Sequence, residues 1–248
     1  MPILTTGRYA ARFASTDADL RAAQSLRYRC FRGGDGLDAD AFDSRCRHLL
    51  IEDRVTRTLL GCCRLMPLAN GAGIGGSYAA QFYELSALQA YDAPMIEIGR
   101  FCIAPEAPDR ADILRIAWSM MTRHVEAEGI GMLFGCASFQ GTDAARYLDT
   151  FAMLRDRHLA PNRWLPRVKA PKVFRFTQRL RRKPNAKLAL RSMPPLLRSY
   201  LVMGGWVSDH AVVDHDLNTL HVFMGLEVSA VPPARLRLLR AVSGQAFG

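Results

Sequence analysis

Two apolar runs that flank a helical pattern constrain the fold of this chain more than any other feature. The first run is MIEIGRFCI, from Met95 to Ile103, and the second is GMLFGCAS, which follows Gly129. Short apolar runs bounded by Pro or Gly predict buried strands, and the stretch that starts at Asp109 has its apolar residues at helical spacing. The succession strand, helix, strand predicts an α/β fold.

The first run carries two charges, Glu97 and Arg100, within an otherwise apolar strand. An unpaired buried charge is costly. The two residues are therefore either structural ions paired with other charges or the floor of a functional site, and both interpretations stay open on residue chemistry alone.

Further elements surround this core. The stretch YAARFAS predicts a strand, Thr16 with Asp19 predicts a capping box that opens a helix ending near Phe31, and HLLIED with TLLGCCRLMPL predicts a hairpin joined by RVTR. A helix is expected from Thr142 towards Arg157. Another is expected over PPLLRSYLVMGG, where Pro opens it and Gly ends it, followed by the strand TLHVFMGLEV.

Length and cysteine content narrow the class. A chain of 248 residues predicts one domain with appendages. Its six cysteines show no CxxC spacing and predict reduced thiols in a cytoplasmic protein. The sequence contains no run of about 20 apolar residues, and its first residues do not match a secretory signal.

The charge is strongly uneven. Between Arg157 and Ser208 the chain has 13 of its 33 Lys and Arg and no Asp or Glu. A segment of one sign predicts an acidic partner or an anionic lipid surface, although a nucleic acid would also suit the charge and a solvated face is the alternative. The candidate contacts are Arg175, Arg179, Arg181, Arg182 and Lys183, which are mixed with Phe174, Phe176 and Leu180.

Four motifs carry a resemblance to known families. They are LRYRCF, LDADAFD, GCCRL and EIGRF, and they resemble the acyl-homoserine lactone synthases, which share a GNAT-like fold. Together with the tail MPPLLRSYLVMGGWVSDHAVVDHDLNT, they are more similar to the L-ornithine Nα-acyltransferases, which make lyso-ornithine lipid from ornithine and a 3-hydroxyacyl carrier protein.

This resemblance implies a mixed central sheet flanked by helices, with a basic C-terminal extension. The implied division is a GNAT-like core over 1–160, a basic segment over 161–192, and a part over 193–248 that completes the sheet and the acceptor side. It also implies an N-acyltransferase that works in the cytoplasm at the inner membrane surface.

Glu97 is the expected catalytic residue. Acyl transfer to an amine needs a base for the ammonium proton, and the glutamate at this position is the favoured base in the resembling synthases. Arg100 would point to the opposite face of the strand unless a bulge intervenes, and the GNAT fold characteristically has such a bulge here.

An aspartate cluster follows the sequence GGDG. Turn chemistry alone explains Asp38, Asp40 and Asp43, but Asp40 or Asp43 could also pair with Arg64 or Arg27, or receive a substrate ammonium. The candidate substrate-binding residues are Arg27, Phe31, Asp40, Asp43, Arg64 and Arg100.

The connection after the charged strand, APEAPDRAD, contains no glycine. Acetyl-coenzyme A enzymes of the superfamily usually hold the pyrophosphate there on a glycine-rich loop. We therefore expect the phosphopantetheine arm of an acyl carrier protein as donor, no tightly bound cofactor, L-ornithine as acceptor and no nucleic-acid partner.

No metal site is expected. DHDLN places Asp214, Asp216 and Asn218 as in a calcium loop but lacks the central glycine, and position twelve is Gly225. The six histidines show no zinc spacing with the cysteines. The alternatives in function are an acyl-homoserine lactone synthase and a non-enzymatic basic protein that binds membrane or nucleic acid.

Overall fold

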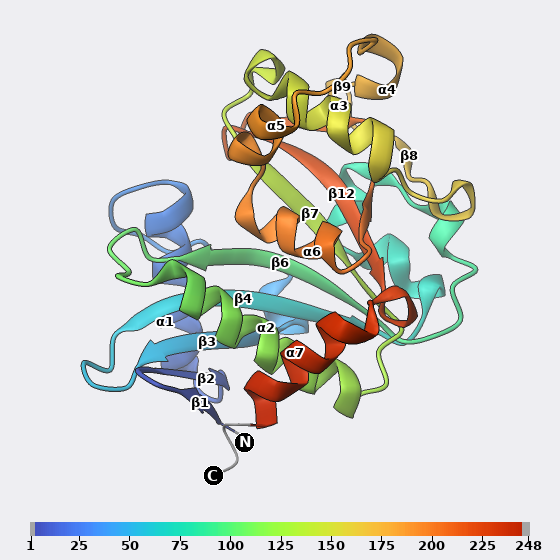
Figure 1. The fold of residues 1–248 in the computed structure, drawn as a ribbon. Helices are drawn as coiled ribbons and strands as arrows, with labels where there is room; N and C mark the ends of the chain where they lie inside the picture. Colours follow the sequence, from blue (N-terminus) through green and yellow to red (C-terminus); the bar gives the residue numbers. More distant parts are fainter. Residues whose placement is uncertain (1–2, 245–248) are drawn as a thin grey trace. The chain divides into compact units, whose positions relative to one another are not determined.

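The chain forms two compact units, each assembled from stretches that are separated in the sequence. The structure is a computed structural model and describes residues 3–244 (Figure 1). The first unit contains the described residues up to Pro67, then Ile98–Ile130 and the described residues from Pro232 onward; the second contains Leu68–Glu97 and Gly131–Val231. This grouping rests on packing, whereas the division at 1–160, 161–192 and 193–248 rests on resemblance and charge and stays a prediction.

The sheet of the first unit has the order β1-β2-β3-β4-β6. Its strands are β1 Leu4–Thr6, β2 Tyr9–Phe13, β3 Arg47–Asp53, β4 Leu59–Leu68 and β6 Met95–Ile103. The first four pair antiparallel with their neighbours, and β3 and β4 form the predicted hairpin. The strand β6 belongs to the second unit as far as Glu97 and to the first unit from Ile98 onward.

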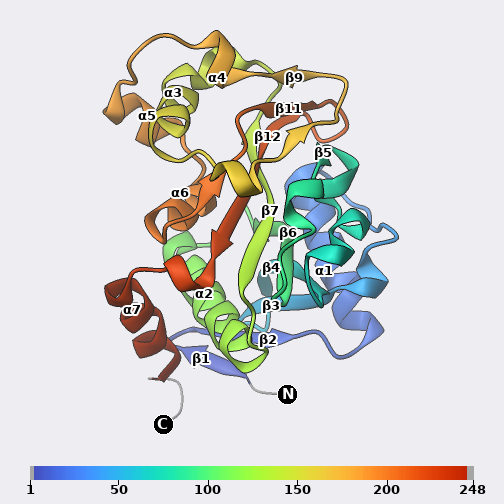
Figure 2. The ribbon, with the colours of Figure 1, turned by 90° about the vertical axis from the view of Figure 1, so that its right-hand side faces the viewer.

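Helices cover both faces of this first sheet (Figures 1 and 2). They are α1 Asp17–Phe31 and α2 Arg110–Ala127, and α7 Pro233–Gly244 packs against α2. Successive residues of β4 face opposite ways, since a Cβ on Gly61 would meet Ile113 of α2 at 3.2 Å, whereas the Cys62 thiol lies 3.8 Å from the Ala23 carbonyl of α1. The predicted capping box of α1 is confirmed by reciprocal bonds between Thr16 and Asp19.

The sheet of the second unit has the order β7-β12-β11-β9. Its strands are β7 Met132–Gln140, β9 Val173–Phe174, β11 Ala211–Asp214 and β12 Thr219–Glu227; β10 Trp206–Val207 also pairs with β12. The pairing of β12 with β7 is antiparallel over nine residues, from Thr219 opposite Gln140 to Glu227 opposite Met132. A separate two-stranded sheet joins β5 Tyr83–Glu84 to β8 Arg167–Val168.

Four helices belong to the second unit, namely α3 Leu148–Arg157, α4 Phe176–Arg179, α5 Ala186–Ser192 and α6 Pro195–Val202. The predicted helix from Thr142 is wrong at its start, because Asp143 accepts a bond from the Ala145 amide and begins a 3-10 turn instead. The 3-10 turns along the chain are Asp43–Arg45, Gly71–Gly76, Ala79–Gln81, Ser86–Leu88, Ala144–Tyr147, Asn162–Trp164 and Val228–Ala230.

The basic segment 161–192 is built into the second unit. Its strand β9 pairs with β11, and its aromatic residues pack on Phe151 of α3, where the ring of Phe176 stacks at 5.2 Å and that of Phe174 lies at 5.5 Å. Phe176 is fully buried and Leu180 is almost so. The predicted basic C-terminal extension is therefore an integral part of the second unit, and its residues Phe176 and Leu180 pack in the core.

The α/β class predicted from the sequence is confirmed. The predicted strands at β2, β3, β4, β6, β7 and β12, and the helices α1, α2 and α6, are all present. All six cysteines are free thiols. Within residues 3–244 no helix is both long and apolar enough to cross a bilayer.

Candidate active site

Three arginines and three aspartates of the first unit alternate in a closed ring of ion pairs. Each member contacts two members of opposite charge. Because the ring has three charges of each sign, its net charge is zero. In order around the ring they are Arg27, Asp43, Arg64, Asp40, Arg100 and Asp38. We call this set the ion-pair ring.

Arg27 is the most deeply buried member, with 1% of its surface exposed. It projects from α1 and donates Nη1 to Asp43 Oδ1 at 2.8 Å, Nη2 to Asp43 Oδ2 at 3.0 Å, and Nε to Asp38 Oδ2 at 3.0 Å. Bidentate pairing of this kind compensates a buried guanidinium well. Burial lowers the pKa of Arg27, but its hydrogen bonds and ion pairs with Asp43 and Asp38 together outweigh that effect and raise it.

Asp43 is held as an anion. It follows the aspartate loop, opens the 3-10 turn Asp43–Arg45, and also accepts a bond from Gln24 Nε2 at 2.9 Å. Burial alone would raise its pKa, but the bonds from Arg27 and Gln24 hold that pKa well below its usual range. The nearby His48 donates its Nε2–H to the Asp43 backbone carbonyl at 3.0 Å, and burial lowers the pKa of this imidazole.

Arg64 and Arg100 close the ring. Arg64 Nη1 lies 2.5 Å from Asp40 Oδ1 and 3.0 Å from Asp43 Oδ1. Arg100 Nε lies 2.9 Å from Asp38 Oδ2, and its Nη2 lies 3.6 Å from Asp40 Oδ2. The pairing of Asp40 and Asp43 with Arg64 and Arg27 is thus present in the structure.

Arg100 adopts a left-handed backbone conformation, with φ of 53°. A non-glycine residue in this region costs on the order of 1–3 kcal/mol, and such residues are typical of β-bulges. The ion pairs with Asp38 and Asp40 offset this cost. Arg64 lies close to Gly99, where an added Cβ would stand 3.5 Å from its Nε.

The members of the ring differ in access to water. The Asp40 side chain is 26% exposed, whereas those of Asp38 and Asp43 are 6% and 5% exposed. Asp40 is therefore the carboxylate of the ring that a soluble molecule can reach. Phe31, the last residue of α1, is half-buried and is not a member of the ring.

Glu97 lies in the second unit and has a different environment. It is 4% exposed, and each carboxylate oxygen accepts one backbone bond, Oε2 from the Tyr78 amide at 2.8 Å and Oε1 from the Ala79 amide at 2.7 Å. Bonds from amide donors favour the charged carboxylate. The strand β6 thus carries one charge paired with carboxylates, at Arg100, and one held by backbone amides, at Glu97.

The amides of Tyr78 and Ala79 were not predicted from the sequence. Every non-proline residue has a backbone N–H, so no residue type marks the two that hold Glu97. A partial signal is Ser77, whose Oγ accepts from the Ala80 amide at 3.1 Å and begins the turn.

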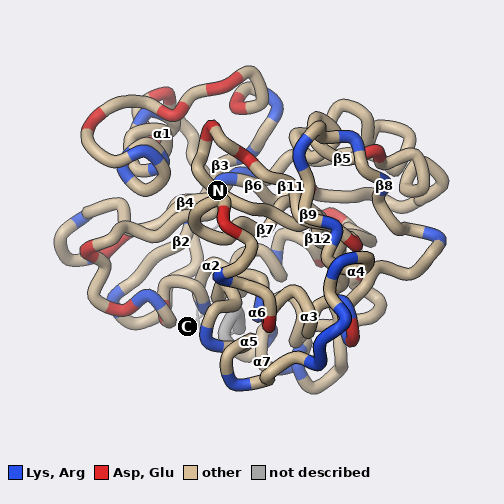
Figure 3. Tube along the Cα trace, turned by 90° about the horizontal axis from the view of Figure 1, so that it is seen from above, with Lys and Arg blue, Asp and Glu red and all other residues tan. Residues whose placement is uncertain are grey.

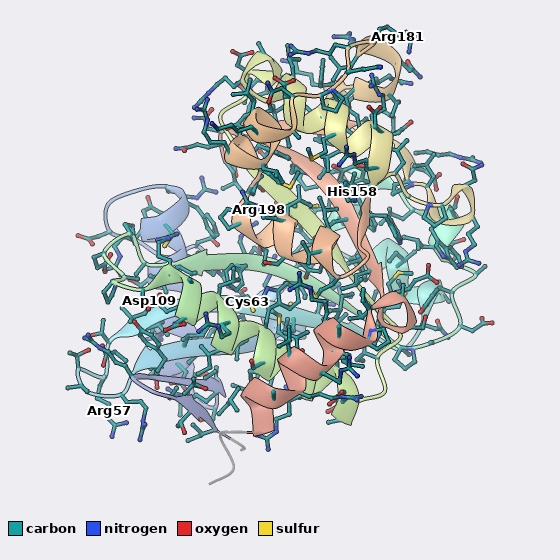
Figure 4. All side chains as sticks on the ribbon, viewed as in Figure 1. Arg57, Cys63, Asp109, His158, Arg181 and Arg198 are labelled. Carbon is teal, nitrogen blue, oxygen red and sulfur yellow. The ribbon has the colours of Figure 1, made fainter. Side chains whose placement is uncertain are left out.

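The five candidate basic contacts, Arg175, Arg179, Arg181, Arg182 and Lys183, are all exposed and lie on α4 and the stretch beside it (Figure 3). We call them the basic cluster. Arg181 projects from the stretch after α4 (Figure 4), and Arg182 pairs with Asp149 Oδ1 at 2.9 Å. The exposed side chains of the basic cluster therefore place positive charge at the surface of the second unit.

The connection from β6 to α2 ends at an acidic helix start. Asp109, labelled in Figure 4, caps α2 by accepting the Asp112 amide at 3.1 Å. Asp112 adds a second carboxylate in the first turn. Arg110 Nη1 donates to the Ala104 carbonyl at 2.9 Å, within the connection itself. A helix N-terminus favours a bound anion such as a phosphate, and here two carboxylates of the protein already occupy that position.

The Asp214–Asn218 stretch forms the turn between β11 and β12. Asp214 Oδ1 accepts the amides of Asp216 at 2.9 Å and Leu217 at 3.1 Å, and Asn218 takes a left-handed φ of 49°. These bonds explain the spacing of its polar residues as turn chemistry.

Comparison with known proteins decides the family. Residues 26–118 match the family described as Acetyltransferase (GNAT) domain. The chain is 33% identical over 239 residues to an L-ornithine N(alpha)-acyltransferase of Rhodobacter capsulatus, with 90% of this chain and 91% of that protein covered. The chain belongs to the L-ornithine Nα-acyltransferase family. It is also 30% identical over 246 residues to a family member of the same name from Brucella abortus, with 91% and 86% covered.

The fold agrees with this family. FeeM, an N-acyl amino acid synthase from uncultured soil microbes, superimposes with a TM-score of 0.54 at 12% identity, covering 93% of this chain and 99% of that chain. That likeness shows the fold alone, and it confirms the predicted GNAT-like fold. As a member of the L-ornithine Nα-acyltransferase family, the chain is an N-acyltransferase, and the interpretation as a non-enzymatic basic protein is set aside.

Proposed function

We propose that the chain transfers a 3-hydroxyacyl group from acyl carrier protein to the α-amine of L-ornithine and so forms lyso-ornithine lipid. The similarity to two L-ornithine N(alpha)-acyltransferases over about nine-tenths of the chain carries this proposal. Both relatives are covered almost completely, so the similarity extends well beyond the GNAT domain.

Glu97 is the proposed base. Attack on a thioester requires a neutral amine, and a carboxylate can take the ammonium proton directly or through one water. The amides of Tyr78 and Ala79 hold both oxygens in place. The geometry therefore supports a carboxylate whose two oxygens are fixed in position before the substrate arrives.

The ion-pair ring is proposed to form the acceptor side. Asp40 is its most accessible carboxylate and can receive a cationic amine of ornithine. Arg27 and Asp43 pair with each other and with other members of the ring, so we assign them to holding the aspartate loop in place. Arg64 and Arg100 orient Asp40, and Phe31 is proposed to line the same side at the end of α1.

The proposed donor is the phosphopantetheine arm of acyl carrier protein. Asp109 and Asp112 at the start of α2 disfavour a pyrophosphate at that helix end, which supports a donor other than coenzyme A. Acyl carrier proteins are strongly acidic, and the exposed basic cluster offers them a complementary surface. The same cluster could rest on anionic lipid headgroups, which would place the enzyme on the inner membrane surface.

A direct assay tests the proposal. The purified chain is incubated with 3-hydroxyacyl carrier protein and either L-ornithine or S-adenosylmethionine, and products are identified by mass spectrometry. Nα-acylated ornithine supports the proposal. An acyl-homoserine lactone formed from S-adenosylmethionine would assign the chain to the alternative chemistry, and the absence of acylated ornithine would overturn the proposed function.

A further inference from the structure

The turn that holds Glu97 has nearly all of its backbone groups engaged. The amides of Tyr78 and Ala79 bind Glu97, and the Ala80 amide binds Ser77 Oγ. The amides of Gln81 and Phe82 donate to the carbonyls of Tyr78 and Ala79, at 3.1 Å and 3.0 Å. We call this stretch, 77–82, the Glu97 turn.

Two further bonds of the Glu97 turn come from the basic segment. Lys169 Nζ donates to the Ala80 carbonyl at 2.6 Å, and the amide of Ala170 donates to the Phe82 carbonyl at 3.0 Å. Directly after the turn, Tyr83 pairs with Val168 in the ladder between β5 and β8. Lys169 and Ala170 therefore bond to the turn itself, Val168 pairs with the residue directly after it, and Lys169 supplies the charged contact.

We propose that Lys169 is a positioning residue that holds the Glu97 turn and, through the turn, orients the Glu97 carboxylate. Its effect on turnover rests on the proposed role of Glu97 as base, whereas its effect on the turn does not. Lys169 itself is not assigned to contact with either substrate.

The physical basis is the position of the contact within the turn. Ala80 directly follows Ala79, whose amide binds Glu97 Oε1 at 2.7 Å, so a shift of the Ala80 carbonyl moves that amide as well. A bond from an ammonium to a carbonyl is roughly twice as strong as one between neutral groups. Misplacement of a catalytic group by about 1 Å can cost about 10²-fold in rate, so a modest loosening of this turn is measurable.

Three variants separate positioning from charge. Lys169→Met removes the ammonium but keeps the stem, and Lys169→Arg keeps a cation that can reach the carbonyl. Lys172→Met is the matched control, because it removes the same charge from an exposed side chain three residues away, whose backbone carbonyl binds the Val213 amide. Hydrogen exchange of the Tyr78 and Ala79 amides is measured in each, together with kcat and KM for acylated carrier protein and ornithine.

In Lys169→Met we expect the two amides to exchange about tenfold faster and kcat to fall about tenfold, with little change in the KM for ornithine. Lys169→Arg should restore both quantities, and Lys172→Met should leave amide exchange and kcat as in the wild type. Unchanged exchange in Lys169→Met, or equal effects of Lys169→Met and Lys172→Met, would overturn the proposal.

Failure of the proposed function is distinguishable from failure of this inference. Amide exchange is read without turnover, so it tests the contact between Lys169 and the turn whatever reaction the enzyme performs. If Glu97→Gln keeps full activity while Lys169→Met loosens the two amides, the base assignment is wrong and the Lys169 contact stands. If the amides of Lys169→Met stay protected, the inference is wrong whatever the role of Glu97.

Discussion

Arg27 and Asp43 are joined by two parallel hydrogen bonds, Nη1 to Oδ1 at 2.8 Å and Nη2 to Oδ2 at 3.0 Å, with both side chains almost completely buried. Neither charge reaches water if its partner is removed. A buried ion pair of this kind adds little net stability over apolar residues of similar volume, but removal of one partner is strongly destabilising because it leaves a buried charge without its counterion.

Asp43→Asn should lower the free energy of unfolding by about 3 kcal/mol, because Arg27 loses its bidentate partner inside the protein. Asp40→Asn is the control within the same ring, and its cost should stay below about 1 kcal/mol because the Asp40 side chain is partly exposed. Urea unfolding of both variants measures the difference. Equal losses would show that burial of the pair does not decide its contribution.

The stability of the wild type should also depend on pH through Asp43. The folded state lowers the pKa of this carboxyl below its unfolded value of about 3.9, so its contribution is complete above that value and is lost as pH falls towards the folded pKa. The wild type should therefore lose stability more steeply than Asp43→Asn on acidification below about pH 5. Denaturant midpoints collected across that range measure the two slopes, and parallel slopes would contradict the assignment.

Glu97→Gln should reduce turnover by a factor on the order of 10² to 10⁴. A glutamine has a single acceptor oxygen, so one of the two amide bonds is lost as well, and thermal unfolding must show that the fold is retained. If Glu97 acts as base, the defect should shrink at pH values where the acceptor amine is already neutral. A folded variant with unchanged turnover at neutral pH would rule out that role.

Acylated carrier protein should be used with a far higher kcat/KM than the matching acyl-coenzyme A. The carboxylates of Asp109 and Asp112 stand at the helix end where a pyrophosphate would otherwise bind, and repulsion raises the cost of placing one there. Steady-state kinetics with both donors of one chain length provide the comparison. Similar values of kcat/KM would show that the enzyme accepts coenzyme A by another route.

Reversal of Arg181 and Lys183 to Glu should weaken the use of carrier protein and the binding of anionic liposomes, most clearly at low salt. Arg182 is left in place because it pairs with Asp149. The matched control reverses Arg235 and Arg237 on α7, two exposed residues in the other unit that give the same change in net charge. The control should show neither effect. Equal effects in the two variants would mean that net charge, and not the position of the basic cluster, determines binding.

Local patterns predicted much of the fold. Alternating or continuous apolar runs gave β2, β6 and β12, and cap chemistry gave the start of α1 at Thr16. The short strands β8 and β9 were not predicted, because strands of two residues have no periodicity to detect. The burial of Phe176 could not be predicted either. Aromatic residues within a basic segment fit a surface and a core equally well, and the sequence does not show that Phe176 packs on Phe151.

The site was predictable to the extent that it consists of charged side chains. Opposite charges at Arg27, Asp43 and Arg64 indicated ion pairs, and the structure contains them. Closure of these pairs into a ring depends on the left-handed backbone at Arg100. Among residue types, only glycine and asparagine indicate this conformation in a sequence, so it could not be predicted at an arginine. The hydrogen bonds to Glu97 could not be predicted either, because their donors are backbone amides.

The closed arrangement of the six charges restricts how these positions can change over evolutionary time. In an isolated ion pair, exchanging the two residues restores the attraction. Here an exchange of Arg27 with Asp43 would set an aspartate at 27 against Asp38 and an arginine at 43 against Arg64, creating two repulsions for the one attraction restored. Alternation survives only if all six signs reverse together, so stepwise substitution at any one position is expected to be strongly constrained by the other five.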